Sequence, residues 1–164
     1  LKMIKRLNEG VDHWGGQLAG ASDITIGAAA NPGAQDLDVE LSKTKAKIDG
    51  GAVFFQTQLV FDGDQFLRFM DKIRPTGAKV LCGVFPVRSY KGALKMNEIP
   101  GVKVPDALLK KLETSKNPEE DGIQAAADLI ARIKGSCAGV HLMTMNRVES
   151  IPQILDRAGI LAKA

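Results

Sequence analysis

Residues 54–62 read Phe54-Phe55-Gln56-Thr57-Gln58-Leu59-Val60-Phe61-Asp62, an apolar run interrupted by two glutamines. The run begins near Ala52, after Gly50-Gly51, and stops just before a helical pattern. Largely apolar runs of this length are typical of strands buried on both faces of a parallel sheet. A buried amide without a partner costs about 1–3 kcal/mol, so the glutamines either bond neighbouring backbone or line a site. Gln58 is near the carboxyl end of the predicted strand, where α/β proteins bind ligands.

Strands and helices alternate on both sides of this run. Apolar runs predict strands at 23–30, 52–61, 79–85 and 138–144. Helical spacing predicts helices at 1–7, 36–49, 90–96, 106–114, 119–134 and 148–158, and one that starts at Asp62 or Asp64 and ends before Pro75. This alternation predicts an α/β fold with a parallel sheet. Four βα units are half of a (β/α)8 TIM barrel, which usually needs about 250 residues; the alternative is a small doubly wound sheet.

Length and composition fit one domain over residues 1–164, with 45% hydrophobic and 25% charged residues. Lysines and arginines are interspersed with acids, and the net charge is only +3, so we expect no nucleic-acid surface. No apolar stretch approaches the roughly 18 residues of a membrane span. Cys82 and Cys137 lack disulfide or zinc-ligand spacing, which predicts buried free thiols and a cytoplasmic location. The first residues read as the middle of a helix, which predicts a fragment.

The predicted helix at 36–49 carries a charged face. Glu40, Lys43 and Lys47 recur at i, i+3 and i+7, away from the apolar stripe of the same helix. Such a face is most often a solvated ladder of ion pairs, worth a few tenths of a kcal/mol. Taken on spacing alone, these three residues therefore indicate a solvent-exposed surface.

Other residues whose side chains could bind a ligand or a metal give weaker signals. Trp14 is the single tryptophan, and we expect it to pack over a neighbouring element. His13 and His141 are the only histidines and have no ligand-spaced partner, so no metal site is predicted. His141 falls on the last predicted strand and reads as a hydrogen-bonded core residue. No GxGxxG or GxxxxGK[ST] loop follows any strand, which weakens the dinucleotide-binding and P-loop interpretations.

Several blocks of sequence resemble the methylenetetrahydrofolate reductase family, in the right order and over nearly the whole chain. The most specific are the TQLVFD block at 57–62 and the HLMTMNR block at 141–147. The remaining blocks are NEG at 8–10, GAAANP at 27–32, KIDGGA at 47–52 and GVFPV at 83–87.

This resemblance implies a (β/α)8 barrel that carries FAD. Members of the family reduce 5,10-methylenetetrahydrofolate to 5-methyltetrahydrofolate, an oxidoreductase reaction of one-carbon metabolism and methionine biosynthesis. NAD(P)H or another donor reduces the flavin. The chain would correspond to about strands five to eight of the barrel, so residues 1–164 would form its second half. The folate substrate and the electron donor are then the expected partners.

The resemblance also assigns roles, position by position. Gln58 matches the glutamine that hydrogen-bonds the pterin, and Arg147 matches an arginine that helps to bind folate. The expected flavin contacts are Asn31, Glu40, Lys43 and Lys47. Two departures stand out: Met96 replaces a ligand-stacking phenylalanine of some relatives, and Gly92 replaces a longer polar residue that contacts substrate in some members. Tyr90 reads as a packing residue, with an aromatic surface near the ligand as the alternative.

The resemblance implies that the family's catalytic glutamate and flavin-tuning aspartate lie on strands that this chain lacks. Asp62 and Glu98 are weak substitutes, so no catalytic residue is assigned and the isolated chain is expected to be inactive. A second hypothesis makes the chain a non-catalytic half-barrel. Its open sheet edges would pair with another copy or with the missing half-barrel.

Overall fold

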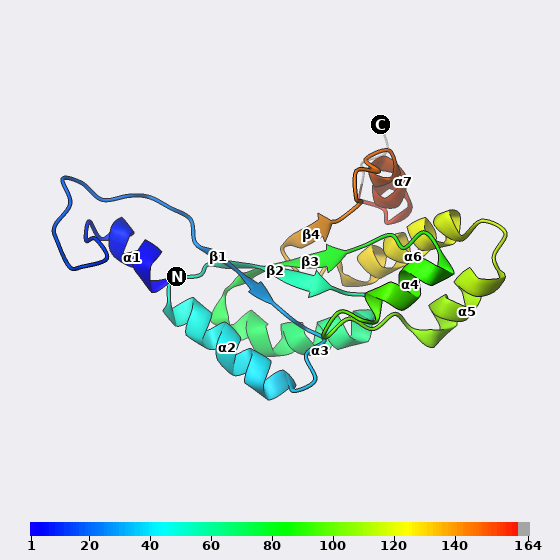
Figure 1. Cartoon of the computed structure of the whole chain (residues 1–164), viewed down its shortest axis with the longest axis horizontal. Coiled ribbons are helices and arrows are strands. Elements are labelled where there is room, and N and C mark those ends of the chain that lie inside the picture. Colours follow the sequence, from blue (N-terminus) through cyan, green and yellow to red (C-terminus); the bar gives the residue numbers. More distant parts are fainter. Residues whose placement is uncertain (161–164) are drawn as a thin grey trace.

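The computed structural model describes residues 1–160, and its elements alternate as expected (Figure 1). The helices and strands are α1 (Lys2–Asn8), β1 (Gly27–Ala30), α2 (Leu37–Asp49), β2 (Phe54–Leu59), α3 (Gly63–Ile73), the 3-10 turn η1 (Arg74–Thr76), β3 (Lys79–Val84), α4 (Tyr90–Met96), α5 (Asp106–Thr114), α6 (Pro118–Ile133), β4 (Gly139–Leu142) and α7 (Ser150–Arg157). The predicted helices at 90–96 and 106–114 are confirmed with the same bounds. Asp62, not Asp64, caps α3, because its carboxylate accepts from the backbone N–H groups of Asp64 and Gln65.

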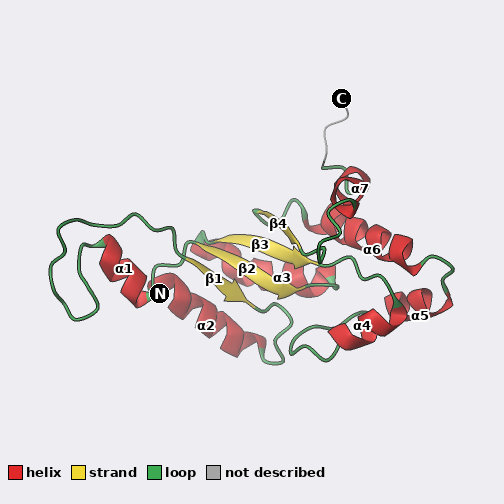
Figure 2. Cartoon of the chain, turned by 45° about the horizontal axis from the view of Figure 1, so that its top comes forward, coloured by secondary structure: helices red, strands yellow, loops and turns green. Residues whose placement is uncertain are grey.

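The strands form one parallel sheet in the order β1-β2-β3-β4. Each strand therefore pairs with the next one along the chain. In Figure 2 the sheet faces the viewer and α3 lies behind it. Consecutive order with the helices on one face is the arrangement of successive βα units in a barrel. A doubly wound sheet would need helices on both faces, so that alternative is wrong for the described residues.

The main core lies between the sheet and its helices. Phe55 and Cys82 point from β2 and β3 into this layer and are fully buried. They meet Phe66 and Phe69 of α3 and Ile130 of α6, which are also fully buried. Burying a side chain of this size contributes about 1.5–3 kcal/mol. These contacts fix the helix-covered face of the sheet and leave the alternate residues of each strand on the opposite face.

A second, smaller core forms beyond the end of β3. Val87, Ala93, Val104 and Leu112 are buried together here, from α4, α5 and the segments that flank them. Tyr90 packs against this cluster, as predicted. The partly buried apolar residues around it also include Phe61, Phe85, Met96, Leu108 and Leu109.

The segment before β1 departs from the predictions. The first strand begins at Gly27 instead of at residue 23. The side-chain amide of Asn8 donates to the Ile24 carbonyl at 2.9 Å and accepts from the Ile24 N–H at 3.0 Å, so these groups are not available to β2. Trp14 is 89% exposed, and the expectation that it packs over an element is wrong. Between residues 1 and 160, no helix is both long and apolar enough to cross a membrane.

Candidate functional site

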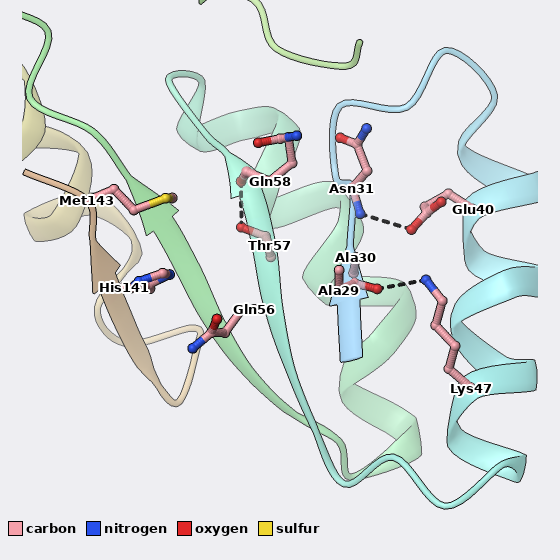
Figure 3. A pocket seen from close by; sticks show the side chains of 10 residues that line it. All are labelled: Ala29, Ala30, Asn31, Glu40, Lys47, Gln56, Thr57, Gln58, His141 and Met143. Carbon is pink, nitrogen blue, oxygen red and sulfur yellow. Dashed lines mark hydrogen bonds between the residues drawn. The ribbon is translucent and has the colours of Figure 1, made fainter. Parts of the chain in front are cut away.

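An open pocket of about 450 Å³ lies on the uncovered face of the sheet, towards the carboxyl ends of β1 and β2 (Figure 3). Residues from α2 and from the β4 region complete its wall. The lining residues are Ala29, Ala30, Asn31, Glu40, Lys47, Gln56, Thr57, Gln58, His141 and Met143. The pocket thus brings together four of the six predicted site residues.

A hydroxyl inserted into the sheet shapes the floor of the pocket. The Gly83 N–H donates to the Thr57 hydroxyl at 2.8 Å, and this hydroxyl donates to the Gln58 carbonyl at 2.8 Å. The pairing of β2 with β3 shifts register at this point, between Gln56 and Leu59. Such an irregularity bends a strand and re-aims its side chains. Here it sets the direction of Gln58 at the mouth of the pocket.

Gln58 is half-buried; its amide bonds neighbouring backbone and also lines the pocket, the two alternatives that the sequence left open. Its side-chain oxygen accepts from the Leu59 N–H at 2.9 Å, so neighbouring backbone satisfies one end. Because the Leu59 N–H is a donor, the atom that faces it must be the amide oxygen. The NH₂ group is then at the other end of the amide. Gln58 lines the pocket, and within residues 1–160 its NH₂ group forms no hydrogen bond with the protein.

Glu40 and Lys47 bond the free edge of β1. The Lys47 ammonium donates to the Ala29 carbonyl at 2.7 Å, and the Glu40 carboxylate accepts from the Asn31 N–H at 2.9 Å. Figure 3 shows both backbone groups turned away from β2, towards α2. Glu40 is only 8% exposed, so the predicted solvated ion-pair ladder is wrong for this residue. Lys43 is exposed and does not line the pocket.

Asn31 ties the end of β1 to a distant loop. Its amide NH₂ donates to the Pro100 carbonyl at 3.2 Å, and its amide oxygen accepts from the Gly33 N–H at 3.1 Å. Gly101 has φ +80°, and a Cβ there would come within 2.2 Å of the Asn31 amide. The Asn31 side chain therefore holds the segment before α5 against the pocket rim, with both of its polar atoms engaged.

The structure does not bring Arg147 into the pocket. Met145 and Asn146 have φ of 51° and 67°, so the chain reverses just after β4. The Arg147 side chain is 55% exposed, and its guanidinium lies 3.4 Å from the Glu149 carboxylate. Left-handed backbone at non-glycine residues is uncommon and occurs often at ligand sites.

Both glutamines of β2, expected to bond backbone or to line a site, line the pocket, and Gln56 has the strand spacing that puts it on the same face as Gln58. Sequence reasoning missed Thr57 and Met143 as pocket residues. His141 was expected in the core, but it is half-buried and lines the pocket. Glu40 is the one carboxylate among the described lining residues. Neither Asp62 nor Glu98 lies there.

The fold is that of a parallel α/β protein with a pocket towards the carboxyl ends of its strands. Residues 2–159 match the family model described as "Methylenetetrahydrofolate reductase". The chain belongs to the methylenetetrahydrofolate reductase family, which confirms the resemblance drawn from its sequence blocks.

Relatives in this family are longer than the chain. It is 33% identical to "Methylenetetrahydrofolate reductase (NADH) 1" of Arabidopsis thaliana over 129 residues, covering 74% of this chain and 22% of the relative. It is 28% identical to the "5,10-methylenetetrahydrofolate reductase" of Salmonella typhimurium over 156 residues, covering 88% of this chain and 53% of the relative. The chain thus spans about half of the Salmonella protein.

One solved structure is similar in fold. It is titled "Uncharacterized protein from Clostridium thermocellum binds two copies of 5-methyl-5,6,7,8-tetrahydrofolic acid". The match has a TM-score of 0.60 at 16% identity and covers 83% of this chain and 52% of that one. At this identity the likeness supports the α/β fold.

Proposed function

We propose that this chain forms the folate- and flavin-binding side of an FAD-dependent oxidoreductase that reduces 5,10-methylenetetrahydrofolate to 5-methyltetrahydrofolate. Membership of the family supports the reaction, and the pocket on the uncovered face of the sheet supports the location of the site. An NAD(P)H-type donor would supply the electrons. The free thiols of Cys82 and Cys137 suit a reducing, cytoplasmic compartment.

The residues of the pocket fit a flavin. Exposed Ala29 presents only a methyl group to the pocket, and Ala30 beside it turns its methyl group into the core, so a ring can lie close to the backbone of β1. The Lys47 ammonium has three N–H donors and uses one on Ala29, so it can also bind an anionic or carbonyl oxygen. The Glu40 carboxylate can accept from a hydroxyl group. When bound, the flavin supplies hydride transfer to the folate; this chain orients the rings and supplies charge.

Gln58 and Arg147 are the proposed folate contacts. The fixed NH₂ donor of Gln58 suits a ring nitrogen or carbonyl oxygen of a pterin. Arg147 is exposed after β4 and its long side chain can bind an anionic group of the ligand. The Clostridium thermocellum protein that shares the fold is titled as a binder of a reduced folate, which supports this choice of ligand.

Binding measurements on the purified chain test the proposal. Titration calorimetry with FAD and with 5-methyltetrahydrofolate should show saturable binding of at least one of them. Gln58→Leu should weaken folate binding about tenfold, because one hydrogen bond of about 1.4 kcal/mol is lost. Gln153→Leu on α7 makes the same chemical change outside the pocket and should bind as wild type. Absence of binding of both ligands to the wild-type chain would overturn the proposal.

We also propose that the chain alone is inactive, because Glu40, the one carboxylate found in the pocket wall, already bonds the Asn31 N–H. A general acid must reach the atom that it protonates. A steady-state assay with methylenetetrahydrofolate and reduced flavin should give no turnover above free flavin. Turnover well above that background would contradict inactivity.

Pairing with a second set of βα units is the further candidate role. The uncovered face of the sheet carries exposed Gln56, and within residues 1–160 no further strand pairs with β4, whereas side chains of α2 bond the opposite edge at β1. Exposed sheet edges are templates for added strands. Light scattering should therefore show self-association at micromolar concentration, or a complex with the complementary half of a relative. A clean monomer under both conditions would exclude pairing.

A further inference from the structure

Gln56 is an exposed amide in the middle of a strand whose neighbours are apolar. It pairs with Ala29 of β1 on one side and Leu81 of β3 on the other. It lies on the face opposite buried Phe55, because side chains alternate along a strand. Within residues 1–160 its amide forms no hydrogen bond with the protein. Both its oxygen and its NH₂ group are therefore available at the pocket surface.

The neighbouring Gln58 already uses one of these groups. Its oxygen is held by the Leu59 N–H at 2.9 Å, and only its NH₂ end is free of the backbone. A ligand edge that presents a donor next to an acceptor needs an amide with both ends open. Of these two glutamines, Gln56 meets that requirement.

His141 stands across β3 from Gln56. It pairs with Gly83, while Gln56 pairs with Leu81, so the two polar side chains flank the same stretch of β3. Figure 3 shows them reaching over β3 from opposite sides. The imidazole makes no hydrogen bond to the protein within the described part of the chain. Its two nitrogens can therefore serve as donor and acceptor for a ligand.

Gly83 lets two neighbours approach β3 closely between them. A Cβ at this position would meet the Thr57 carbonyl at 2.6 Å and the Met143 methyl at 2.9 Å. Leu81, which pairs with Gln56, is the half-buried side chain of β3 on this face, and Ala29 adds only a methyl group on the far side of Gln56. The pocket thus has an amide on one side of β3, an imidazole on the other and apolar groups between them, an arrangement that suits the edge of a planar ring.

We propose that Gln56 and His141 form a second binding pair in this pocket, which recognises the hydrogen-bonding edge of a planar heteroaromatic ring. The inference rests on the proposed function and makes it more specific. The pterin of a reduced folate and the isoalloxazine of a flavin share this edge chemistry. Gln58 then acts as a single donor at the mouth, while Gln56 pairs with the ring edge in both directions.

Calorimetric titration of the full chain with 5-methyltetrahydrofolate and, separately, with FAD tests the pair and distinguishes the two ring sources. Gln56→Leu should weaken binding of one ligand at least tenfold, and Gln56→Glu, which keeps the acceptor but loses the donor, should weaken it less. His141→Phe should weaken the same ligand. A Gln56→Leu, His141→Phe double variant should lose less than the product of the two single effects, because both contact one ring.

Gln153→Leu is the matched control and should bind as wild type. Gln56 is exposed, so thermal unfolding of its variants should match wild type and separate lost binding from lost folding. A Gln56→Leu chain that binds both ligands within twofold of wild type overturns this inference and leaves the proposed function standing. A wild-type chain that binds neither ligand overturns both together.

Discussion

The ammonium of Lys47 caps the carbonyl of Ala29 at 2.7 Å, on the edge of the sheet that no strand covers in the described structure. About two turns earlier on α2, the Glu40 carboxylate accepts from the N–H of Asn31. Charged side chains from a helix thus take the place of a neighbouring strand. This is one way in which proteins protect an exposed edge from unwanted pairing.

Removal of the cap should loosen this edge. Lys47→Met retains the aliphatic stem but loses the donor, and it should lower the free energy of unfolding by about 1 kcal/mol. The freed edge should also increase self-association. Urea unfolding and light scattering measure the two effects. Lys43→Met, on the same helix but outside the pocket, is the control and should change neither; equal effects of the two substitutions would contradict the edge-cap role.

The Thr57 hydroxyl should be indispensable to the register of β2 and β3. Thr57→Val keeps the shape of the side chain but leaves the buried Gly83 N–H without an acceptor. This should lower the free energy of unfolding by about 1–3 kcal/mol. Thr57→Ser keeps the hydroxyl and should cost less. Chemical denaturation compares the two variants. Equal stability of the valine variant and wild type would show that this hydrogen bond contributes nothing net.

Asn31 should control the segment that carries Pro100. Asn31→Ala removes both side-chain hydrogen bonds and should lower the free energy of unfolding by about 1–2 kcal/mol. Asn31→Asp keeps the acceptor for Gly33 and loses the donor, so its loss should be smaller. Limited proteolysis should cut the alanine variant faster between residues 97 and 104. Unchanged cleavage would show that other contacts hold this segment.

The two thiols should differ in reactivity. Burial raises the pKa of the Cys82 thiol far above its ordinary range, and burial also raises the pKa of half-buried Cys137. Only the thiolate reacts with disulfide reagents, so both should react slowly in the native chain. In a Cys137→Ser variant, the remaining Cys82 should react with such a reagent only on unfolding. Rapid native labelling of that variant would show that β3 opens readily.

Asp121 should make stability depend on pH in the acid range. The Ser115 hydroxyl donates to its carboxylate and the Lys111 ammonium lies 2.9 Å from it, and both lower its pKa below the ordinary 3.8. A carboxyl group whose pKa is lower in the folded state than in the unfolded state stabilises the fold at pH values above its unfolded-state pKa. This contribution is lost as the pH falls through its folded-state pKa. The stability difference between wild type and Asp121→Asn should therefore shrink below pH 3.8. A difference that does not change with pH would point to the Ser115 contact alone.

Local sequence patterns predicted most helices and strands, and the errors arise from contacts between residues that are distant in the sequence. The helical periods of 90–96 and 106–114 reproduce α4 and α5 residue for residue. The strand at 23–30 was too long because the Asn8 amide, far away in the sequence, takes the backbone groups of Ile24.

The same holds for the site. The position of Gln58 near the carboxyl end of the predicted strand was enough to place it at a pocket. The shift of register depends on the Gly83 N–H of the next strand, which no spacing within β2 reveals. Glu40 and Lys47 share a helix face whose spacing looks solvated, and only the position of α2 beside β1 explains their contacts.

The exposed indole of Trp14 has a practical consequence for spectroscopy. It is the chain's single tryptophan, it is 89% exposed, and it is absent from the pocket lining. Its fluorescence already reports a water-like surrounding in the native fold, so melting of the core would change its emission little. Tyr90, the single tyrosine, packs on the second cluster and is the better optical reporter of tertiary structure.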